Sequence, residues 1–291
     1  MKISHRILAS TLGLALVSLT ITQSASAITL PKLLWSQSFN EKVGTKVSTK
    51  FWSYDLGNGM GWGNQEREYY TNKAENISMD GKGNLVITAL KLDPDNPKDQ
   101  YITNWCGDCV YSSAKIVTRG KLAFKYGSIS ARMQVPEGVG MWPAFWLLGV
   151  PRSTCDGWPS CGEIDIMEMR GSDVYHTVST LHGPGYSGGG GLSSYFFTAD
   201  PITPGFHNYR VDWLPNSIKF YVDNELVGAQ TKTSVAPNDW VFNAPFYMIL
   251  NLATGGNFDA GALDESIQKA EFKIDSISYR QLRGYGQLIR Y

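Results

Sequence analysis

Apolar and polar residues alternate with a period of two along much of the chain. Every second side chain is apolar in residues 128–135, which predicts a strand with one buried face. The same alternation runs through residues 209–213 and 218–222, and Pro215-Asn216-Ser217 between them is typical of a hairpin turn. We expect further short strands at 85–89, 163–167 and 246–253, and one short helix at 263–270.

Short strands joined by glycine- and proline-containing turns predict an all-β sandwich or barrel. With 43% hydrophobic and 18% charged residues among 291, the chain can bury a large core, which excludes wholesale disorder. Its 26 basic and 26 acidic residues give a net charge of zero. The sequence has no basic stripe of the kind that nucleic-acid-binding proteins show, so we expect no nucleic-acid partner. No repeat or change of composition follows residue 27, so we expect one domain over residues 28–291.

The N-terminus has the pattern of an export signal. Basic residues at Lys2 and Arg6 precede a mostly apolar run over residues 7–21, and Ala25-Ser26-Ala27 is a small-residue cleavage site. The run is too short and too rich in Ser and Thr for a good membrane span, and no later stretch is long and apolar enough to cross a bilayer. We therefore expect residues 1–27 to be removed and the product to be secreted, to the medium or the periplasm.

The predicted export decides how we interpret the four cysteines. Cys106, Cys109, Cys155 and Cys161 would meet an oxidising compartment, which favours disulfides, with three connectivities open. Free buried thiols are a second possibility. A metal site is a third, although the spacing of the second pair is poor for zinc.

Residues 162–169 carry three acids on one predicted strand. Glu163 and Asp165 share a face, whereas Glu168 is an odd number of positions from both and points the other way on a regular strand. One extra residue in a β-bulge at Ile166-Met167 reverses that parity and brings Glu168 to the same face.

Three acids on one face repel one another and raise at least one pKa, so the arrangement costs stability. Glycoside hydrolysis by two carboxyl groups gives a reason for it. The alternative is an exposed strand whose acids are simply solvated, because acidic alternation is common on solvent faces.

Several segments in the same order resemble glycoside hydrolase family 16. The segment Gly162-Glu-Ile-Asp-Ile-Met-Glu168 is similar to the family signature, and its extra residue resembles the laminarinase branch, since lichenases lack it. Further matching segments are Gly61–Glu66 with Tyr69–Thr71, Tyr126–Arg132, Met141–Gly149, Trp158–Cys161 and Asn251–Phe258.

The resemblance implies a β-jelly-roll sandwich with a concave glucan cleft, and endo-hydrolysis of β-1,3-glucan with retention. By position, Glu163 would be the nucleophile, Glu168 the general acid and then base, and Asp165 the residue that holds the proton state and orientation of Glu163. Alternatives are an endo-1,3(4)-β-glucanase for mixed-linkage glucans, a transglycosylase, and a non-catalytic β-glucan-binding protein. Relatives of the last kind tend to lose a catalytic Glu, and both are present here.

Aromatic and amide side chains in these segments are candidate sugar contacts, because sugar rings pack on flat indoles and their hydroxyls pair with polar groups. Core packing is the alternative for the tryptophans, Trp146 above all. Lys115 stands where many relatives have Arg, so we infer no sugar contact for it. The candidates are Trp62, Trp142, Trp146, Trp158, Asn64, Glu66, His182, Asn251 and Asn257.

A structural calcium ion is common in the family. By resemblance its ligands would be the Asp275 side chain and a backbone carbonyl near Gly83, although calcium takes many oxygens from backbone and water. Catalysis would need no cofactor. We expect a monomer that acts on β-1,3-glucan.

Overall fold

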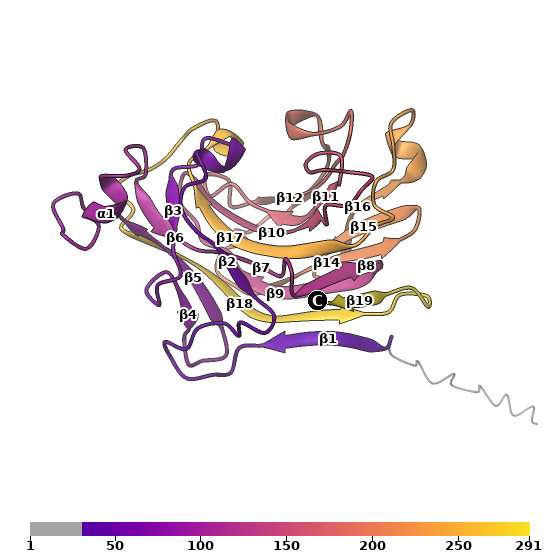
Figure 1. Ribbon diagram of the computed structural model, residues 1–291, viewed down its shortest axis with the longest axis horizontal. Coiled ribbons are helices and arrows are strands. Elements are labelled where there is room, and N and C mark those ends of the chain that lie inside the picture. The colour runs from indigo at the N-terminus through magenta and orange to yellow at the C-terminus, as the bar shows by residue number, and fades with distance from the viewer. Residues whose placement is uncertain (1–30) are drawn as a thin grey trace, which may run out of the picture. The chain divides into compact units, whose positions relative to one another are not determined.

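Two large β-sheets are stacked on each other in residues 31–291, the part of the chain that the computed structural model describes (Figure 1). The first, which we call the back sheet, has 10 strands and is antiparallel except between β3 and β6. In spatial order it contains β16 (Glu225–Thr231), β15 (Ser217–Val222), β14 (His207–Leu214), β9 (Gly127–Gln134), β18 (Lys269–Arg280), β5 (Leu85–Lys91), β6 (Tyr111–Ser113) and β3 (Glu68–Tyr70), with β1 (Leu33–Ser38) beside β18 and β4 (Ile77–Met79) beside β5.

The second, which we call the cleft sheet, has 9 strands. Its order is β13 (Leu192–Phe197), β12 (His176–His182), β11 (Glu163–Glu168), β10 (Met141–Gly149), β17 (Phe246–Thr254), β7 (Lys115–Val117) and β2 (Ser53–Asp55), with β8 (Leu122–Lys125) pairing both β17 and β19 (Gln287–Arg290). Its strands curve in Figure 1, which leaves a concave face turned away from the back sheet. The short helical segments are α1 (Gln100–Thr103), η1 (Gly61–Gly63), η2 (Gly188–Gly190), η3 (Lys232–Val235) and η4 (Asn257–Asp259).

The hydrophobic core lies between the two sheets. In β9 the residues Ile129, Ala131 and Met133 are buried in alternation with more exposed polar ones, as their pattern predicts. Side chains from both sheets join this core, and all of β17 is buried. The expected all-β jelly-roll sandwich is confirmed, and so are the expected strands, within two residues at each end.

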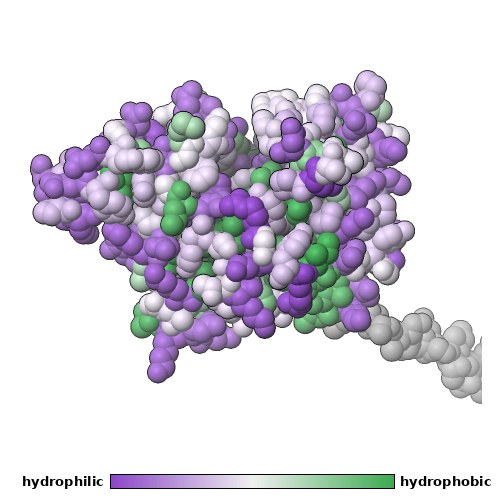
Figure 2. Space-filling model, viewed as in Figure 1, coloured by the Kyte–Doolittle hydropathy of each residue, from purple (hydrophilic) through white to green (hydrophobic). Residues whose placement is uncertain are grey.

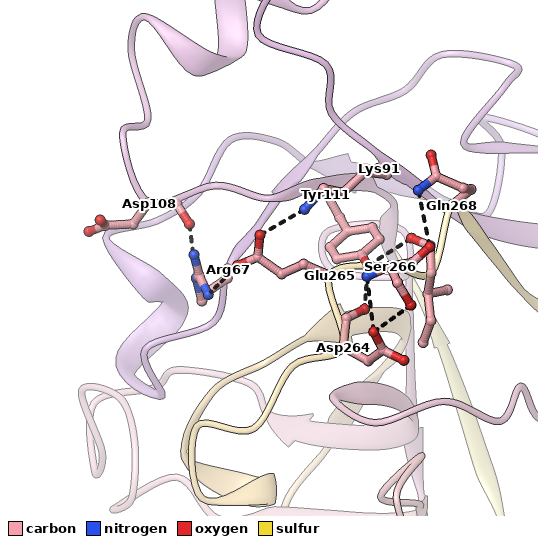
Figure 3. Close-up of polar contacts among 9 residues, drawn as sticks. Arg67, Lys91, Asp108, Tyr111, Asp264, Glu265, Ser266 and Gln268 are labelled. Carbon is pink, nitrogen blue, oxygen red and sulfur yellow. Dashed lines mark hydrogen bonds and ion pairs between the residues drawn. The ribbon is translucent and has the colours of Figure 1, made fainter.

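The expected helix at 263–270 is wrong, because that segment is a turn followed by the start of β18 at Lys269. Figure 3 shows what holds the turn in place: Glu265 accepts from Arg67 at 3.1 Å and from Lys91 at 2.9 Å. The Tyr111 hydroxyl donates to the Asp264 carbonyl at 3.0 Å. These side-chain partners, from strands of the back sheet and from Arg67 just before β3, hold the segment in a non-helical conformation.

All four cysteines are in disulfides, Cys106–Cys109 and Cys155–Cys161, so disulfide formation is confirmed and the connectivity, open from sequence, is resolved. Each bond closes a short loop. Among residues 31–291 there is no helix with the length and apolar character needed to span a bilayer. The predicted signal segment, residues 1–27, lies outside the described residues and stays a prediction.

Candidate active site

A β-bulge interrupts β11 at the predicted place. Against β10, Asp165 pairs with Trp146 and Met167 with Phe145, so Ile166 is an extra residue without a partner of its own. The register against β12 shifts over the same interval. Both Ile166 and Met167 are buried in the core, and the bulge returns the next side chain to the concave face.

Because of the bulge, Glu163, Asp165 and Glu168 line one pocket on the cleft sheet. We call it the first pocket. Figure 2 shows the surface notched at the top of the view, between the groups of loops that carry η1 and η2 in Figure 1. The other residues that line the first pocket are Trp62, Asn64, Glu66, Lys115, Trp142, Ala144, Trp146 and Asn251.

Glu168 is positioned by an indole. The Trp142 Nε1–H donates to Glu168 Oε1 at 3.0 Å. Burial, with the nearby Glu163 adding to it, raises the pKa of Glu168 to about 7, although the Trp142 bond favours the ionised form and acts in the opposite direction. A carboxyl group with this pKa is half protonated near neutral pH, which suits it both to give and to take a proton.

Glu163 and Asp165 form a closely coupled pair. Burial raises the pKa of each well above its ordinary value, and the proximity of Asp165 raises the pKa of Glu163 further. His182 lies opposite Glu163 on β12, and its Nε2 is 3.1 Å from Asp165 Oδ2. Two carboxyl groups this close repel each other when both are ionised, and a ring nitrogen of His182 lies among their oxygens.

A hydrogen-bonded chain supports the wall of the pocket beside Trp146. The Trp146 Nε1–H donates to Asn251 Oδ1 at 2.7 Å, and Asn251 Nδ2 donates to the Tyr70 hydroxyl oxygen at 3.1 Å. Tyr70 donates in turn to Glu66 Oε2 at 3.3 Å, and Asn64 Nδ2 donates to the other oxygen of Glu66 at 3.1 Å. The expected sugar contacts Trp146, Asn251, Glu66 and Asn64 are thus one connected network.

Lys115, for which we inferred no sugar contact, lies inside the first pocket. Its ammonium is 4.3 Å from the centre of the Trp62 ring and 5.1 Å from that of Trp146. Burial lowers the pKa of Lys115, while Glu66 and other nearby acids oppose this change. One of those acids, Glu68, is fully buried and accepts from the Thr254 backbone at 2.7 Å.

Of the remaining expected contacts, Trp142 lines the first pocket, whereas Trp158 and Asn257 line neither pocket. Trp142 stacks on Phe258, with ring centres 4.7 Å apart. Trp158 is 53% exposed, with its ring 6.4 Å from that of His182, so it is open to a bound chain. Asn257 lines neither of the two pockets described here; its backbone N–H donates to the Asn64 carbonyl at 2.7 Å and ties η4 to the loop after η1.

A second pocket adjoins the first at Glu168, the one residue that lines both. Its walls come from the β12 and β13 end of the cleft sheet, whereas those of the first pocket extend through β10 and β17 to β7. Arg170, stacked on Phe258 at 4.6 Å, forms one side. The other residues of the second pocket are Asp173, His176, Thr177, Val178 and Tyr195.

Sequence reasoning missed Glu68, Tyr70 and the walls of the second pocket. Glu66, Glu68 and Tyr70 alternate along one segment, and that alternation is a signal that would have placed them on one face. His176, which lines the second pocket, contacts Asp173 and lies against Phe197, with 4.4 Å between ring centres. Asp173 is three residues away, but Phe197 comes from the neighbouring strand β13, and no local pattern reveals that pairing.

The predicted calcium ligands both lie near the end of β1. Phe39, the residue after β1, bridges to Gly83, and Asp275 is at a register shift in β18. One oxygen of Asp275 is 3.6 Å from the Arg132 guanidinium, and the other accepts from Ser276 at 2.8 Å. Both oxygens of Asp275 thus have protein donors nearby. Calcium stays a prediction from the resemblance.

A β-sandwich that gathers three acids in an aromatic-walled cleft defines a class of protein, the carboxylate-dependent glycoside hydrolases. The family model for glycosyl hydrolases family 16 matches residues 64–278. The chain belongs to glycosyl hydrolases family 16, which confirms the family resemblance seen in the sequence.

Proteins similar to this chain include several glucanases. The chain is 36% identical over 261 residues to glucan endo-1,3-beta-glucosidase A1 of Niallia circulans, covering 82% of this chain and 36% of that relative. It therefore spans about a third of that relative's length. It is 37% identical to a beta-glucanase of Rhodothermus marinus, over 77% of this chain and 76% of the relative. The laminarinase catalytic domain from Thermotoga maritima MSB8 has a TM-score of 0.75 and 36% identity, over 87% of this chain and 98% of that chain.

Proposed function

We propose that this chain hydrolyses internal β-1,3-glucosidic linkages of laminarin-type glucans and retains the anomeric configuration. The observation that supports this most directly is the bulge at Ile166, which brings Glu168 into the same pocket as Glu163 and Asp165. The names of the Niallia and Thermotoga relatives support the β-1,3 linkage as the substrate.

In the first step, Glu163 attacks the anomeric carbon while Glu168 protonates the glycosidic oxygen of the departing sugar. Asp165, whose pKa burial raises well above its ordinary value, holds a proton beside Glu163, so that Glu163 attacks as the carboxylate. Glu168 is suited to be the acid because its pKa is raised to about 7.

In the second step, Glu168 removes a proton from water, and that water attacks the sugar bonded to Glu163. Proximity to the Glu163 carboxylate is one cause of the raised pKa of Glu168. Once Glu163 is esterified, that charge is gone and the pKa of Glu168 falls, so the same group changes from acid to base.

The two pockets give the bound chain a direction. The leaving sugar must lie beside Glu168, and the second pocket contains Glu168 without Glu163. The leaving side of the glucan therefore occupies the second pocket, over β12 and β13. The side that becomes bonded to Glu163 occupies the first pocket, between Trp142, Trp146 and Trp62.

The test is release of reducing ends from laminarin, with lichenan, agarose and carrageenan in parallel. Activity confined to laminarin supports the proposal, activity on lichenan as well favours the 1,3(4) alternative, and no release from laminarin refutes it. Glu163→Gln should abolish release, with Glu137→Gln, an exposed acid outside both pockets, as the control. Proton NMR of the first product should show the β-anomer, and an initial α-anomer would exclude retention.

We also propose that the protein is exported and acts as a monomer. The two disulfides support an oxidising compartment. Detection of a chain that starts at Ile28 outside the cytoplasm would support this, and a retained N-terminus would count against it.

A further inference from the structure

Three aromatic rings lie together where β3 meets the segment between β5 and β6, which contains α1 and the Cys106–Cys109 disulfide, and they lie outside both pockets. Tyr69 of β3 lies between them, with its ring 6.0 Å from Tyr101 and 5.8 Å from Trp105. Both neighbours stand nearly perpendicular to it, at 86° and 90°. We call these three residues the aromatic platform. Trp105 is 71% exposed and Tyr101 is 47% exposed, so broad ring surfaces face the solvent.

The platform is held in place from several sides. Cys106, directly after Trp105, is bonded to Cys109, and both sulfurs pack with Ile102 in a small apolar cluster that Tyr69 also joins. Arg67 donates to the Asp108 carbonyl at 3.2 Å, as Figure 3 shows. An exposed Trp contributes little to folding stability through burial. Because this one is already held in place, it loses less conformational entropy when a ligand binds than a mobile side chain would.

The neighbours of Tyr101 do not turn the platform into an ionic surface. The Lys73 ammonium lies 4.6 Å from the Tyr101 ring centre and 3.6 Å from a Glu75 oxygen, so its charge is compensated nearby. Flat rings with a balanced charge suit a neutral ligand that has apolar faces and hydroxyl edges, which is the chemistry of an unsubstituted glucan.

The platform lies next to a segment that forms part of the wall of the first pocket. Within β3, Glu68 and Tyr70 turn toward the network of the first pocket, and Tyr69 between them faces the platform. Tyr69 is three residues beyond Glu66, a span of about 10 Å in extended chain. Figure 1 shows α1 outside β3 and β6, on the side away from β11 and β12. The first pocket and the platform therefore lie against the two faces of one short segment, Glu66–Tyr70.

We propose that the aromatic platform is a second β-glucan-binding surface, which holds the part of a long chain that extends beyond the cleft. This rests on the proposed function for the identity of the polysaccharide. Its contribution is to the binding of polymers and insoluble glucan. It does not contribute to the chemistry, because none of the three rings lines the pocket that contains the acids.

The test uses the full chain with Glu163→Gln, which binds without turnover, and measures depletion onto insoluble β-1,3-glucan. Trp105→Ala should weaken binding about ten-fold, and Trp105→Phe, which keeps a ring, should restore most of it. The matched control is Tyr285→Ala, which removes an exposed tyrosine that also stands edge-on to another ring, Tyr126, at 5.8 Å. In the active chain, kcat/KM for a soluble β-1,3-tetrasaccharide should not change.

Unchanged binding of the Trp105→Ala variant, or an equal loss in Tyr285→Ala, would overturn the proposal. A parallel fall in tetrasaccharide kcat/KM would also overturn it, because the ring would then belong to the cleft. So would a dimer by sedimentation that Trp105→Ala converts to monomer, since the platform would then be a self-association surface. Failure of the proposed function gives a different result, namely no reducing ends from laminarin in the unaltered chain.

Discussion

Replacing Trp142 by Phe should move the alkaline limb of the activity profile to higher pH. The indole N–H donates to Glu168 Oε1 at 3.0 Å. A hydrogen bond to a charged group contributes about 1.5–3 kcal/mol, against about 0.5–1.5 for a neutral one, so the bond favours the carboxylate over the acid by about 1–1.5 kcal/mol. At 1.36 kcal/mol per pKa unit, removing it raises the pKa of Glu168 by about one unit.

The general acid must be protonated in the free enzyme, so kcat/KM falls as pH rises through its pKa. We expect the midpoint of that fall near 7 for the unaltered chain, and about one unit higher for Trp142→Phe, which keeps a ring to stack on Phe258. The assay is kcat/KM for laminarin between pH 4 and 10. Trp146→Phe is the control, because that indole donates to Asn251 and its loss should leave the midpoint in place. A midpoint that stays or falls in Trp142→Phe would refute the assignment of Glu168 as the acid.

Three further outcomes are expected. Deleting Met167 leaves the acids at regular two-residue spacing on one face, so activity on laminarin should persist. Inserting an alanine before Met167 instead moves the last acid two strand positions, about 7 Å, further along that face and should abolish activity. Lys115→Met should lower the free energy of unfolding by about 3 kcal/mol at pH 8, because Glu66 and Glu68 lose their buried cation. Denaturant titrations at pH 8 and pH 4 should show a smaller loss at pH 4, because burial raises the pKa of both carboxyl groups and they are protonated there. If calcium binds, adding it after chelation should raise Tm in the unaltered chain and not in Asp275→Ala, and an unchanged Tm in both would remove that site from consideration.

The position of the catalytic strand could be predicted from sequence because its information is local. Parity alone shows that Glu168 faces away from Glu163 unless one residue is extra, and the structure has that residue at Ile166. The hairpin over residues 209–222 could be predicted for the same reason, since its strands pair across a turn that is visible in the sequence.

The second pocket could not be predicted, because its walls meet only through long-range pairing. His176 and Tyr195 are brought together by the pairing of β12 with β13, and no spacing in the sequence encodes it. Lys115 was not among the predicted sugar contacts, because an ammonium is a poor substitute for the planar guanidinium of Arg. The structure shows another kind of contact, an ammonium against the faces of Trp62 and Trp146. The expected helix at 263–270 failed because Glu265 pairs with Arg67 and Lys91, far away in sequence.

Because Glu168 lines both pockets, the two fragments of a cleaved glucan can leave one after the other. Under the proposed mechanism, one fragment can diffuse away through the β13 side while the other is still esterified to Glu163. The vacated compartment then admits either a solvent molecule or the hydroxyl of another oligosaccharide, and Glu168 deprotonates whichever arrives. In concentrated glucan the same residues would join chains as well as cut them.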